Sequence, residues 1–170
     1  EFKQGHLPNA INIPDGNKFE TWLGSLISPR ESFYLVAGHQ ADLEQLIYKA
    51  AKIGYEQLIK GALSAPARLS VQSDKANPDK IHQQPEAFTI VDVRNESEVE
   101  EEPVFSNSIN IPLNELREKW NEVPTDKPIA VHCAGGYRSA IGSSILERHQ
   151  PDAEIHDISE SIHELKRAMA

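Results

Sequence analysis

The fold of this chain is decided by the stretch Ile129-Ala130-Val131-His132-Cys133-Ala134-Gly135-Gly136-Tyr137-Arg138-Ser139. Its apolar first part is typical of a short strand that is buried on both faces. Two glycines follow, and beyond residue 139 the apolar side chains are spaced as on one face of a helix. The stretch therefore predicts a strand, a tight loop and a helix, with the only cysteine of the chain in the loop.

This loop is predicted to bind an anion. Backbone N–H groups at the start of a helix lack intrahelical partners, and the helix dipole adds positive potential there. Such donors favour a thiolate, which is the nucleophilic form of cysteine. Arg138 adds a cation with a planar fork of donors. We therefore expect Cys133 to attack an anionic substrate while the loop amides hold the charged intermediate. A buried structural thiol is the alternative, which the glycine-rich turn disfavours.

Four residues lie between Cys133 and Arg138, and this number distinguishes sulfur transfer from phosphate chemistry. Protein tyrosine phosphatases have one residue more in the same place. The smaller ring here suits a terminal sulfur better than a phosphoryl group with its three oxygens. With its Gly-Gly pair and the Ser139 that follows the arginine, the loop resembles the active loop of the rhodanese (sulfurtransferase) superfamily.

The resemblance implies an enzyme that moves a sulfane sulfur from thiosulfate or a low-molecular-weight persulfide to a thiol or cyanide, through a persulfide on Cys133. The substrate-binding residues that it implies are Ala134, Gly135, Gly136, Tyr137, Arg138 and Ser139. Tyr137 is expected at the loop mouth, and Ser139 is expected to cap the helix rather than to donate to the thiolate. The alternatives are a persulfide carrier or regulatory module without catalysis, and a phosphatase or arsenate reductase of the related fold.

An apolar strand that ends in Asp92-Val93-Arg94 opens the module with the cysteine. In the rhodanese family this motif lies beside the active loop, at the carboxyl ends of the parallel strands. We expect Asp92 to hydrogen-bond loop backbone and Arg94 to pair with Glu96 or Glu98. Both residues are predicted to support the loop rather than to react.

A repeat divides the chain. Ile11-Asn12-Ile13-Pro14 recurs as Ile109-Asn110-Ile111-Pro112, and the strand Phe33–Ala37 corresponds to Ile129–Cys133, which indicates two copies with a period of about 97 residues. Because Ala37 takes the place of the cysteine and no arginine closes its loop, the first copy is predicted to be inactive. Each copy is expected to be an α/β domain with a mostly parallel sheet flanked by helices.

The domain prediction has three parts: a degenerate, truncated rhodanese-like domain over residues 1–66, a linker and entry segment over 67–84 and a rhodanese domain with the active cysteine over 85–170. The first copy lacks the strand that the family places before such a start, so we expect further residues ahead of Glu1. An inactive copy followed by an active one resembles the carboxyl-terminal part of a fusion in which a metallo-β-lactamase-fold hydrolase or persulfide dioxygenase precedes two rhodanese domains.

Composition narrows the class of partner. The formal net charge of -9 over 170 residues argues against nucleic acid or an anionic membrane surface. No apolar run approaches the ~20 residues that span a bilayer, and no signal peptide is visible. A single cysteine excludes an internal disulfide and fits a reducing, cytoplasmic location, and it calls for an outside thiol as acceptor. The histidines show no metal-ligand spacing, and no cofactor is expected.

Overall fold

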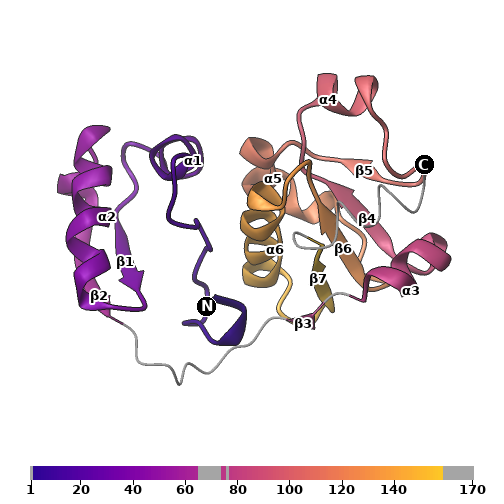
Figure 1. The fold of residues 1–170 in the computed structure, drawn as a ribbon, viewed down its shortest axis with the longest axis horizontal. Coiled ribbons are helices and arrows are strands. Elements are labelled where there is room, and N and C mark those ends of the chain that lie inside the picture. The colour runs from indigo at the N-terminus through magenta and orange to yellow at the C-terminus, as the bar shows by residue number, and fades with distance from the viewer. Residues whose placement is uncertain (1, 65–73, 76, 159–170) are drawn as a thin grey trace. The chain divides into compact units, whose positions relative to one another are not determined.

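The structure of the chain is a computed structural model that describes residues 2–64, 74–75 and 77–158. Its internal contacts divide the chain into two compact units. The first consists of Glu1–Pro8 and Ile13–Gln72, and the second of Asn9–Asn12 and Ser73–Ala170. Figure 1 labels the helices and strands of both units.

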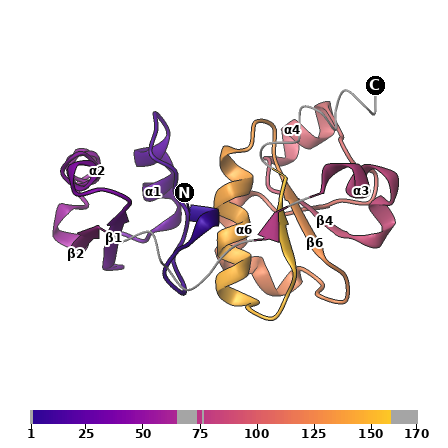
Figure 2. The ribbon, with the colours of Figure 1, turned by 60° about the horizontal axis from the view of Figure 1, so that its bottom comes forward.

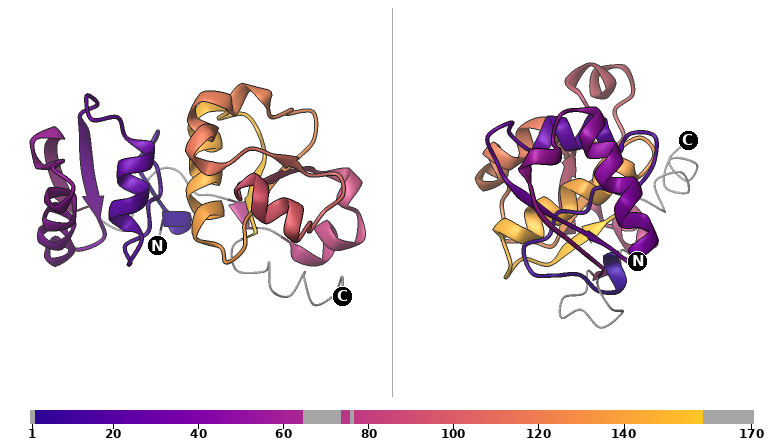
Figure 3. Two further views of the ribbon diagram at one scale, coloured as in Figure 1. Left: turned by 90° about the horizontal axis from the view of Figure 1, so that it is seen from above. Right: turned by 90° about the vertical axis from the view of Figure 1, so that its left-hand side faces the viewer.

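The first unit contains a small parallel sheet. Its elements are η1 (Phe2–Gln4), α1 (Phe19–Leu26), β1 (Phe33–Ala37), α2 (Gln40–Lys52), η2 (Glu56–Leu58) and β2 (Ile59–Ser64). Strands β1 and β2 pair in parallel and are joined through α2. Helices α1 and α2 pack with β1 around one apolar core, which includes Phe19, Leu35 and Leu46 (Figure 3). The strand at 33–37 lies where the sequence predicts it.

The second unit is a five-stranded parallel sheet with the strand order β3-β7-β6-β4-β5. Its strands are β3 (Asp74–Lys75), β4 (Thr89–Asp92), β5 (Ile109–Asn110), β6 (Ile129–His132) and β7 (Ile155–Asp157). Its helices are α3 (Pro78–Gln83), η3 (Pro85–Ala87), α4 (Glu96–Glu101), α5 (Leu113–Lys119), η4 (Trp120–Glu122) and α6 (Tyr137–His149). The central strands β4 and β6 are buried along their whole length, as their apolar sequences predict.

Alternate residues of β4 and β6 face opposite layers of helices, since side chains along a strand alternate between the two faces. Ile90 and Ala130 belong to the cluster that contains Ile81 of α3. Val131 lies on the other face, where α6 approaches the sheet at Gly142. Figure 2 shows α6 and α3 on opposite sides of these strands. The loop after β6 therefore leads directly into a helix that packs on its own strand.

The predicted α/β class with parallel sheets and flanking helices is confirmed. The later part of the segment predicted as linker and entry segment, 67–84, contains β3, which pairs with β7, and α3, whose Ile81 is fully buried. The spacing of Leu165 and Ala168 in the sequence predicts a closing helix, and this segment lies outside the described residues. Among the described helices, none is long and apolar enough to cross a membrane.

Candidate active site

Cys133 lies between the end of β6 and the start of α6, and its side chain is buried, with 2% of the residue exposed. The sulfur accepts hydrogen bonds from two main-chain N–H groups. Gly136 N lies 3.0 Å and Ser139 N lies 3.4 Å from Cys133 Sγ. The loop amides are therefore directed at the sulfur from the first turn of the helix, and the side chain does not point away from them into the apolar interior.

The turn around the sulfur depends on Gly136. This residue is the N-cap of α6 and has a φ of 91°, a conformation that side chains with a Cβ rarely adopt. In this conformation the chain reverses tightly enough for Gly136 N–H to face Cys133. The preceding Gly135 is exposed, and an added Cβ there would meet open space. Ala134 is half-buried beside the cysteine.

Ser139 does not cap the helix, because Gly136 occupies the N-cap position. The Ser139 hydroxyl is fully buried and donates to the carbonyl oxygen of Gly136 at 3.1 Å. The same hydroxyl oxygen lies 3.6 Å from Cys133 Sγ and accepts from the thiol. The hydroxyl therefore contacts the sulfur as an acceptor, and its own hydrogen is directed at Gly136 rather than at Cys133.

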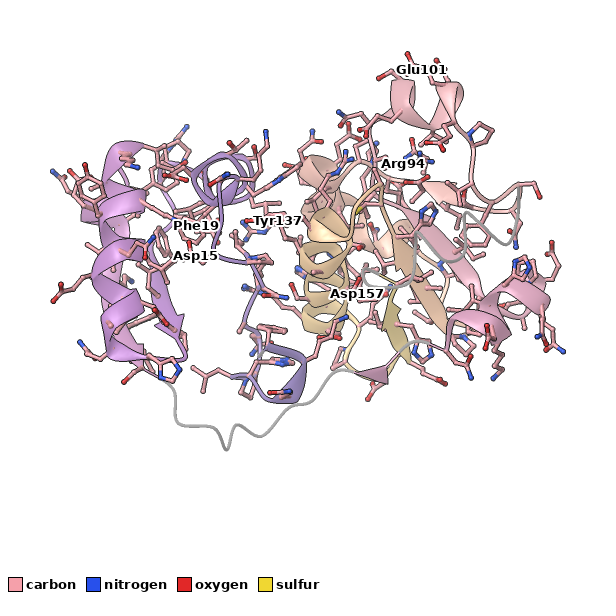
Figure 4. All side chains as sticks on the ribbon, viewed as in Figure 1. Asp15, Phe19, Arg94, Glu101, Tyr137 and Asp157 are labelled. Carbon is pink, nitrogen blue, oxygen red and sulfur yellow. The ribbon has the colours of Figure 1, made fainter. Side chains whose placement is uncertain are left out.

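Arg138 is engaged by a carboxylate. Its Nη1 and Nη2 donate to Oε2 and Oε1 of Glu98 at 2.6 and 2.7 Å. Tyr137, the first residue of α6, is half-buried and is labelled at that turn in Figure 4. Of the six loop residues predicted to bind substrate, the structure thus brings Gly136 and Ser139 to the sulfur and turns the guanidinium of Arg138 towards Glu98.

Asp92 and Arg94 pair with each other, which corrects the expectation that Arg94 pairs with Glu96 or Glu98. Arg94 Nη2 lies 2.6 Å from Asp92 Oδ2, and Arg94 Nε lies 3.0 Å from both carboxylate oxygens. Asp92 also accepts from the main-chain N–H of Arg94 at 3.0 Å. The carboxylate therefore fixes the turn after its own strand rather than the cysteine loop.

The Asp92 carboxylate also lies beside the strand that carries the cysteine. His132 Nε2 is 3.5 Å from Asp92 Oδ2, and the buried imidazole meets the ring of Phe105 edge-on, with centroids 5.2 Å apart. Asn110 at the end of β5 donates to the carbonyl oxygens of Asp92 and Arg94, both at 2.9 Å. These contacts join the carboxyl ends of three neighbouring strands, where sites in parallel sheets lie.

Two contacts of this site were not predicted from the sequence: the pairing of Glu98, expected as a partner of Arg94, with Arg138, and the support from Asn110. Glu98 follows Asn95 at the spacing of a capping box, which places its carboxylate at the start of a helix that leaves the same edge of the sheet. That spacing is the signal that could have connected it with Arg138. Asn110 belongs to the repeated Ile-Asn-Ile-Pro motif, which was used to recognise the repeat and not to locate a support.

The ion pairs shift the ionisation of their members. Hydrogen bonds from Arg138 lower the pKa of Glu98 from its usual value near 4.5 to about 2. The reciprocal hydrogen bonds from Glu98 raise the pKa of Arg138, and the hydrogen bonds to Asp92 raise the pKa of Arg94. Both guanidinium groups and the Glu98 carboxylate are therefore charged throughout the physiological range.

Neither a metal site nor a surface cavity adds to the cysteine loop in the described part of the chain. No group of three or more potential metal-binding side chains occurs there. A surface cavity of about 270 Å³ lies at the amino ends of β4 and β6, and its lining includes Glu86, Phe88 and Lys127 but none of the predicted loop residues. The chemistry of the cysteine loop is thus separate from this cavity.

Comparison with known proteins agrees with this geometry. Residues 72–168, which include the whole loop and both flanking elements, match the family described as rhodanese-like domain. The chain belongs to the rhodanese-like domain family. The matched region begins before β3, in keeping with the place of β3 and α3 in the sheet of the second unit. The rhodanese-like domain thus contains a single, buried cysteine at the end of its central strand.

Individual relatives cover parts of the chain. "Uncharacterized protein YqhL" of Bacillus subtilis (strain 168) is 33% identical over 60 residues, which are 35% of this chain and 47% of YqhL. The match thus spans less than half the length of this curated relative.

Two solved structures are similar as well. A rhodanese-related protein from Thermoplasma volcanium is 36% identical, with 53% of this chain and 91% of that chain covered and a TM-score of 0.44. SseA from Escherichia coli, described as a 3-mercaptopyruvate sulfotransferase, is 13% identical, with 92% of this chain and 76% of that chain covered and a TM-score of 0.42.

Proposed function

We propose that the second unit is a sulfurtransferase that moves a sulfane sulfur from thiosulfate or a low-molecular-weight persulfide to a thiol or cyanide, with Cys133 as the nucleophile. The observation that carries the proposal is the pair of main-chain N–H groups directed at Cys133 Sγ, from Gly136 at 3.0 Å and Ser139 at 3.4 Å. Donors in these positions stabilise a sulfur anion, whether it is the thiolate or the persulfide that replaces it.

In the first step, the Cys133 thiolate attacks the outer sulfur of the donor. A bond forms between Cys133 Sγ and that sulfur, and the S–S bond of the donor breaks. Sulfite leaves from thiosulfate, whereas a thiolate leaves from an organic persulfide. The leaving group takes the electron pair of the broken bond, so no outside oxidant or reductant is needed. The extra sulfur remains on Cys133 as a persulfide.

In the second step, an acceptor thiolate or cyanide attacks the outer sulfur of the Cys133 persulfide. The new bond joins the acceptor to that sulfur, and the Cys133 thiolate leaves into the same two N–H donors that held it before. Since Cys133 is the only cysteine of the chain, the acceptor comes from outside it. Once the thiol has lost its proton, rotation of the Ser139 hydroxyl hydrogen from Gly136 O towards Cys133 Sγ, 3.6 Å away, gives the thiolate a further donor in both steps.

A persulfide carrier or regulatory module is the second candidate, and the engagement of Arg138 by Glu98 favours it, because a neutralised cation gives a charged acceptor little attraction. A phosphatase or arsenate reductase is disfavoured by the same contact. Those reactions need the arginine fork for the oxygens of the substrate, and here the fork holds a carboxylate.

The test is the intact mass of the protein after incubation with thiosulfate and with glutathione persulfide. Transfer chemistry predicts an adduct of about 32 Da, one sulfur atom, on the wild type and none on Cys133→Ala. Addition of cyanide or glutathione should then remove the adduct. A stable adduct without release would favour the carrier, and turnover of an aryl phosphate without any sulfur adduct would favour the phosphatase.

We also propose that the first unit is an inactive, truncated copy of the same domain, that both units belong to a tandem, and that a metallo-β-lactamase-fold hydrolase or persulfide dioxygenase precedes them in the parent protein. The support is a common parallel β-α-β arrangement: β1-α2-β2 in the first unit and β6-α6-β7 in the second. Ala37 ends β1 where Cys133 follows β6. Determining the sequence of the parent gene upstream of Glu1 tests the tandem and the fusion, and the absence of any sulfur adduct or sulfur transfer in Cys133→Ala tests the inactivity of the first unit.

A further inference from the structure

The positive charge of the cysteine loop is cancelled by a residue from another element. The guanidinium of Arg138 and the carboxylate of Glu98 face each other through two hydrogen bonds, 2.6 and 2.7 Å long. The Arg138 side chain is 17% exposed and that of Glu98 is 34% exposed, so the pair lies at the edge of the buried site and not in open solvent. A fork-to-fork arrangement of this kind is the strongest form of arginine and carboxylate pairing.

Glu98 is held in this position by its own helix. It is the third residue of α4, and its Oε2 accepts the main-chain N–H of Asn95 at 3.1 Å, which closes a capping box. The pKa of Glu98, lowered to about 2 chiefly by the hydrogen bonds from Arg138, keeps the carboxylate ionised at neutral pH. The negative charge is therefore permanent and fixed in place.

The pair lies beside the cysteine loop, because Arg138 immediately precedes Ser139, whose main-chain N lies 3.4 Å from Cys133 Sγ. A negative charge on Cys133 is one of the influences that raise the pKa of Arg138, so the two groups interact electrostatically. Two further acidic residues of α4, Glu100 and Glu101, are exposed. Neither forms an ion pair with a cation among the described residues, whereas Glu98 pairs with Arg138. An anion that enters the loop thus meets a neutralised arginine and a carboxylate, rather than a free cation.

We propose that Glu98 is a specificity-determining residue that selects the sulfur donor by charge. On the basis of the proposed sulfur transfer, Glu98 favours organic persulfides as sulfur donors over inorganic thiosulfate. In thiosulfate the transferred sulfur is bonded directly to a sulfonate, so the negative charge must enter the loop with it. An organic persulfide reacts as its neutral form, RSSH, in which the transferred sulfur is bonded to sulfur and hydrogen and any carboxylates lie further away.

The first test measures charge selection at Cys133 without sulfur transfer. Cys133 is alkylated with iodoacetate, an anion, and with iodoacetamide, its neutral analogue, and the ratio of the two rate constants is determined. The ratio cancels any change in the thiolate fraction, because both reagents attack the same thiolate. Since the chain has one cysteine, intact mass reports on that site only.

The variants are Glu98→Gln, which keeps the length of the side chain and an acceptor for Asn95, and Glu101→Gln as the matched control. Glu101 belongs to the same helix, is exposed and points away from the sheet in Figure 4. Removal of the Glu98 charge, which also frees the guanidinium of Arg138, should raise the iodoacetate to iodoacetamide ratio about tenfold in Glu98→Gln. The ratio should stay within about twofold in Glu101→Gln, whose charge is screened by solvent.

A measurement on the wild type tests charge selection even if Glu98→Gln does not fold. Added chloride should raise the iodoacetate to iodoacetamide ratio of Cys133 more than it raises the same ratio for free glutathione, because salt screens a repulsion. A fall relative to glutathione would mean that the loop attracts anions, and that result would overturn the charge selection. So would a Glu98→Gln ratio no different from that of Glu101→Gln.

The donor comparison then connects charge selection with the reaction. The rate of sulfur uptake from thiosulfate should rise about tenfold in Glu98→Gln, and uptake from glutathione persulfide should change less than about threefold. Equal gains for both donors would overturn the assignment of donor class. If neither donor gives an adduct on the wild type while the alkylation ratio still responds to Glu98, the proposed function fails and the selection against anions stands as a property of the site.

Discussion

Arg94 and Asp92 form an ion pair inside the second unit, with Nη2 and Oδ2 2.6 Å apart and each side chain 1% exposed. Only one residue separates them along the chain, so the pair closes the turn that follows β4. Asn110 holds the same turn through the carbonyl oxygens of both residues. A buried pair of this kind adds little net stability relative to apolar residues, but removal of one member leaves an uncompensated charge.

Substitution of Arg94 by Met should therefore lower the free energy of unfolding by about 3–5 kcal/mol. The Asp92 carboxylate would lose its Nε and Nη2 donors while it remains buried beside His132. Urea unfolding followed by circular dichroism measures the loss.

The control is Lys119→Met, which breaks the pair with Glu115 at 2.7 Å on the surface of α5. Both side chains of that pair are well exposed, so the expected loss is below about 1 kcal/mol. Equal losses in Arg94→Met and Lys119→Met would contradict the role assigned to the buried pair.

The two adjacent glycines of the loop should respond differently to alanine. Gly136→Ala forces a Cβ into a φ of 91° and should cost about 1–2 kcal/mol of stability. Because the Gly136 N–H donates to Cys133 Sγ at 3.0 Å, any shift of the turn should also slow alkylation or persulfidation of the cysteine. Gly135→Ala meets no atom within 4 Å and should leave both properties close to wild type. Urea unfolding and the rate of iodoacetamide modification test the contrast, and a loss of similar size in Gly135→Ala would argue against it.

The sequence predicted the parts of this site that follow from chain order. Cys133 was predicted at the start of a helix from the buried apolar strand before it, the Gly-Gly turn and the helical face after it. Asp92 was predicted at the end of a neighbouring strand because the sheet is parallel. These features depend on periodicity and on the backbone conformations that glycine permits. They did not require knowledge of any side-chain torsion.

The pairing of charged side chains could not be predicted in the same way. Glu96 and Glu98 both lie in the first turn of α4, a few residues after Arg94, so chain order permits several pairs. The choice depends on rotamers and on competing acceptors. Asp92 satisfies Arg94 within the turn, and the capping box then leaves the Glu98 carboxylate facing Arg138. The prediction that Ser139 caps the helix was wrong for a different reason. The first residue of a helix depends on backbone torsions, here that of Gly136, which the sequence does not determine to one residue.

The Ser139 hydroxyl should matter to the chemistry more than to the fold. Ser139→Ala keeps the main-chain N–H that lies 3.4 Å from Cys133 Sγ but removes the hydroxyl at 3.6 Å. Loss of one hydrogen bond of about 1 kcal/mol should slow sulfur uptake at Cys133 roughly 3- to 10-fold. The control is Ser143→Ala, one turn further along α6, whose hydroxyl donates to the Ala140 carbonyl and contacts no reacting group. Equal slowing in the two variants would remove Ser139 from the site.

The contact between Glu98 and Arg138 also predicts a specific dependence of stability on acid. Since folding lowers the pKa of Glu98 from near 4.5 to about 2, the contribution of the carboxylate is complete above pH 4.5 and is lost as the pH falls towards 2. With Glu98 about one third exposed, solvent screening limits that contribution to about 1 kcal/mol.

Glu98→Gln lacks this titration, so its deficit in free energy of unfolding relative to the wild type should be largest near neutral pH. By about pH 3 the deficit should shrink to roughly half or less, because the wild type has by then lost most of the advantage of its ionised carboxylate. Urea unfolding at about pH 6 and pH 3 measures the change, with Glu101→Gln as the variant whose difference from wild type should remain near zero at both. A Glu98→Gln deficit that stays constant or grows on acidification would show that Arg138 does not hold the carboxylate in its ionised form.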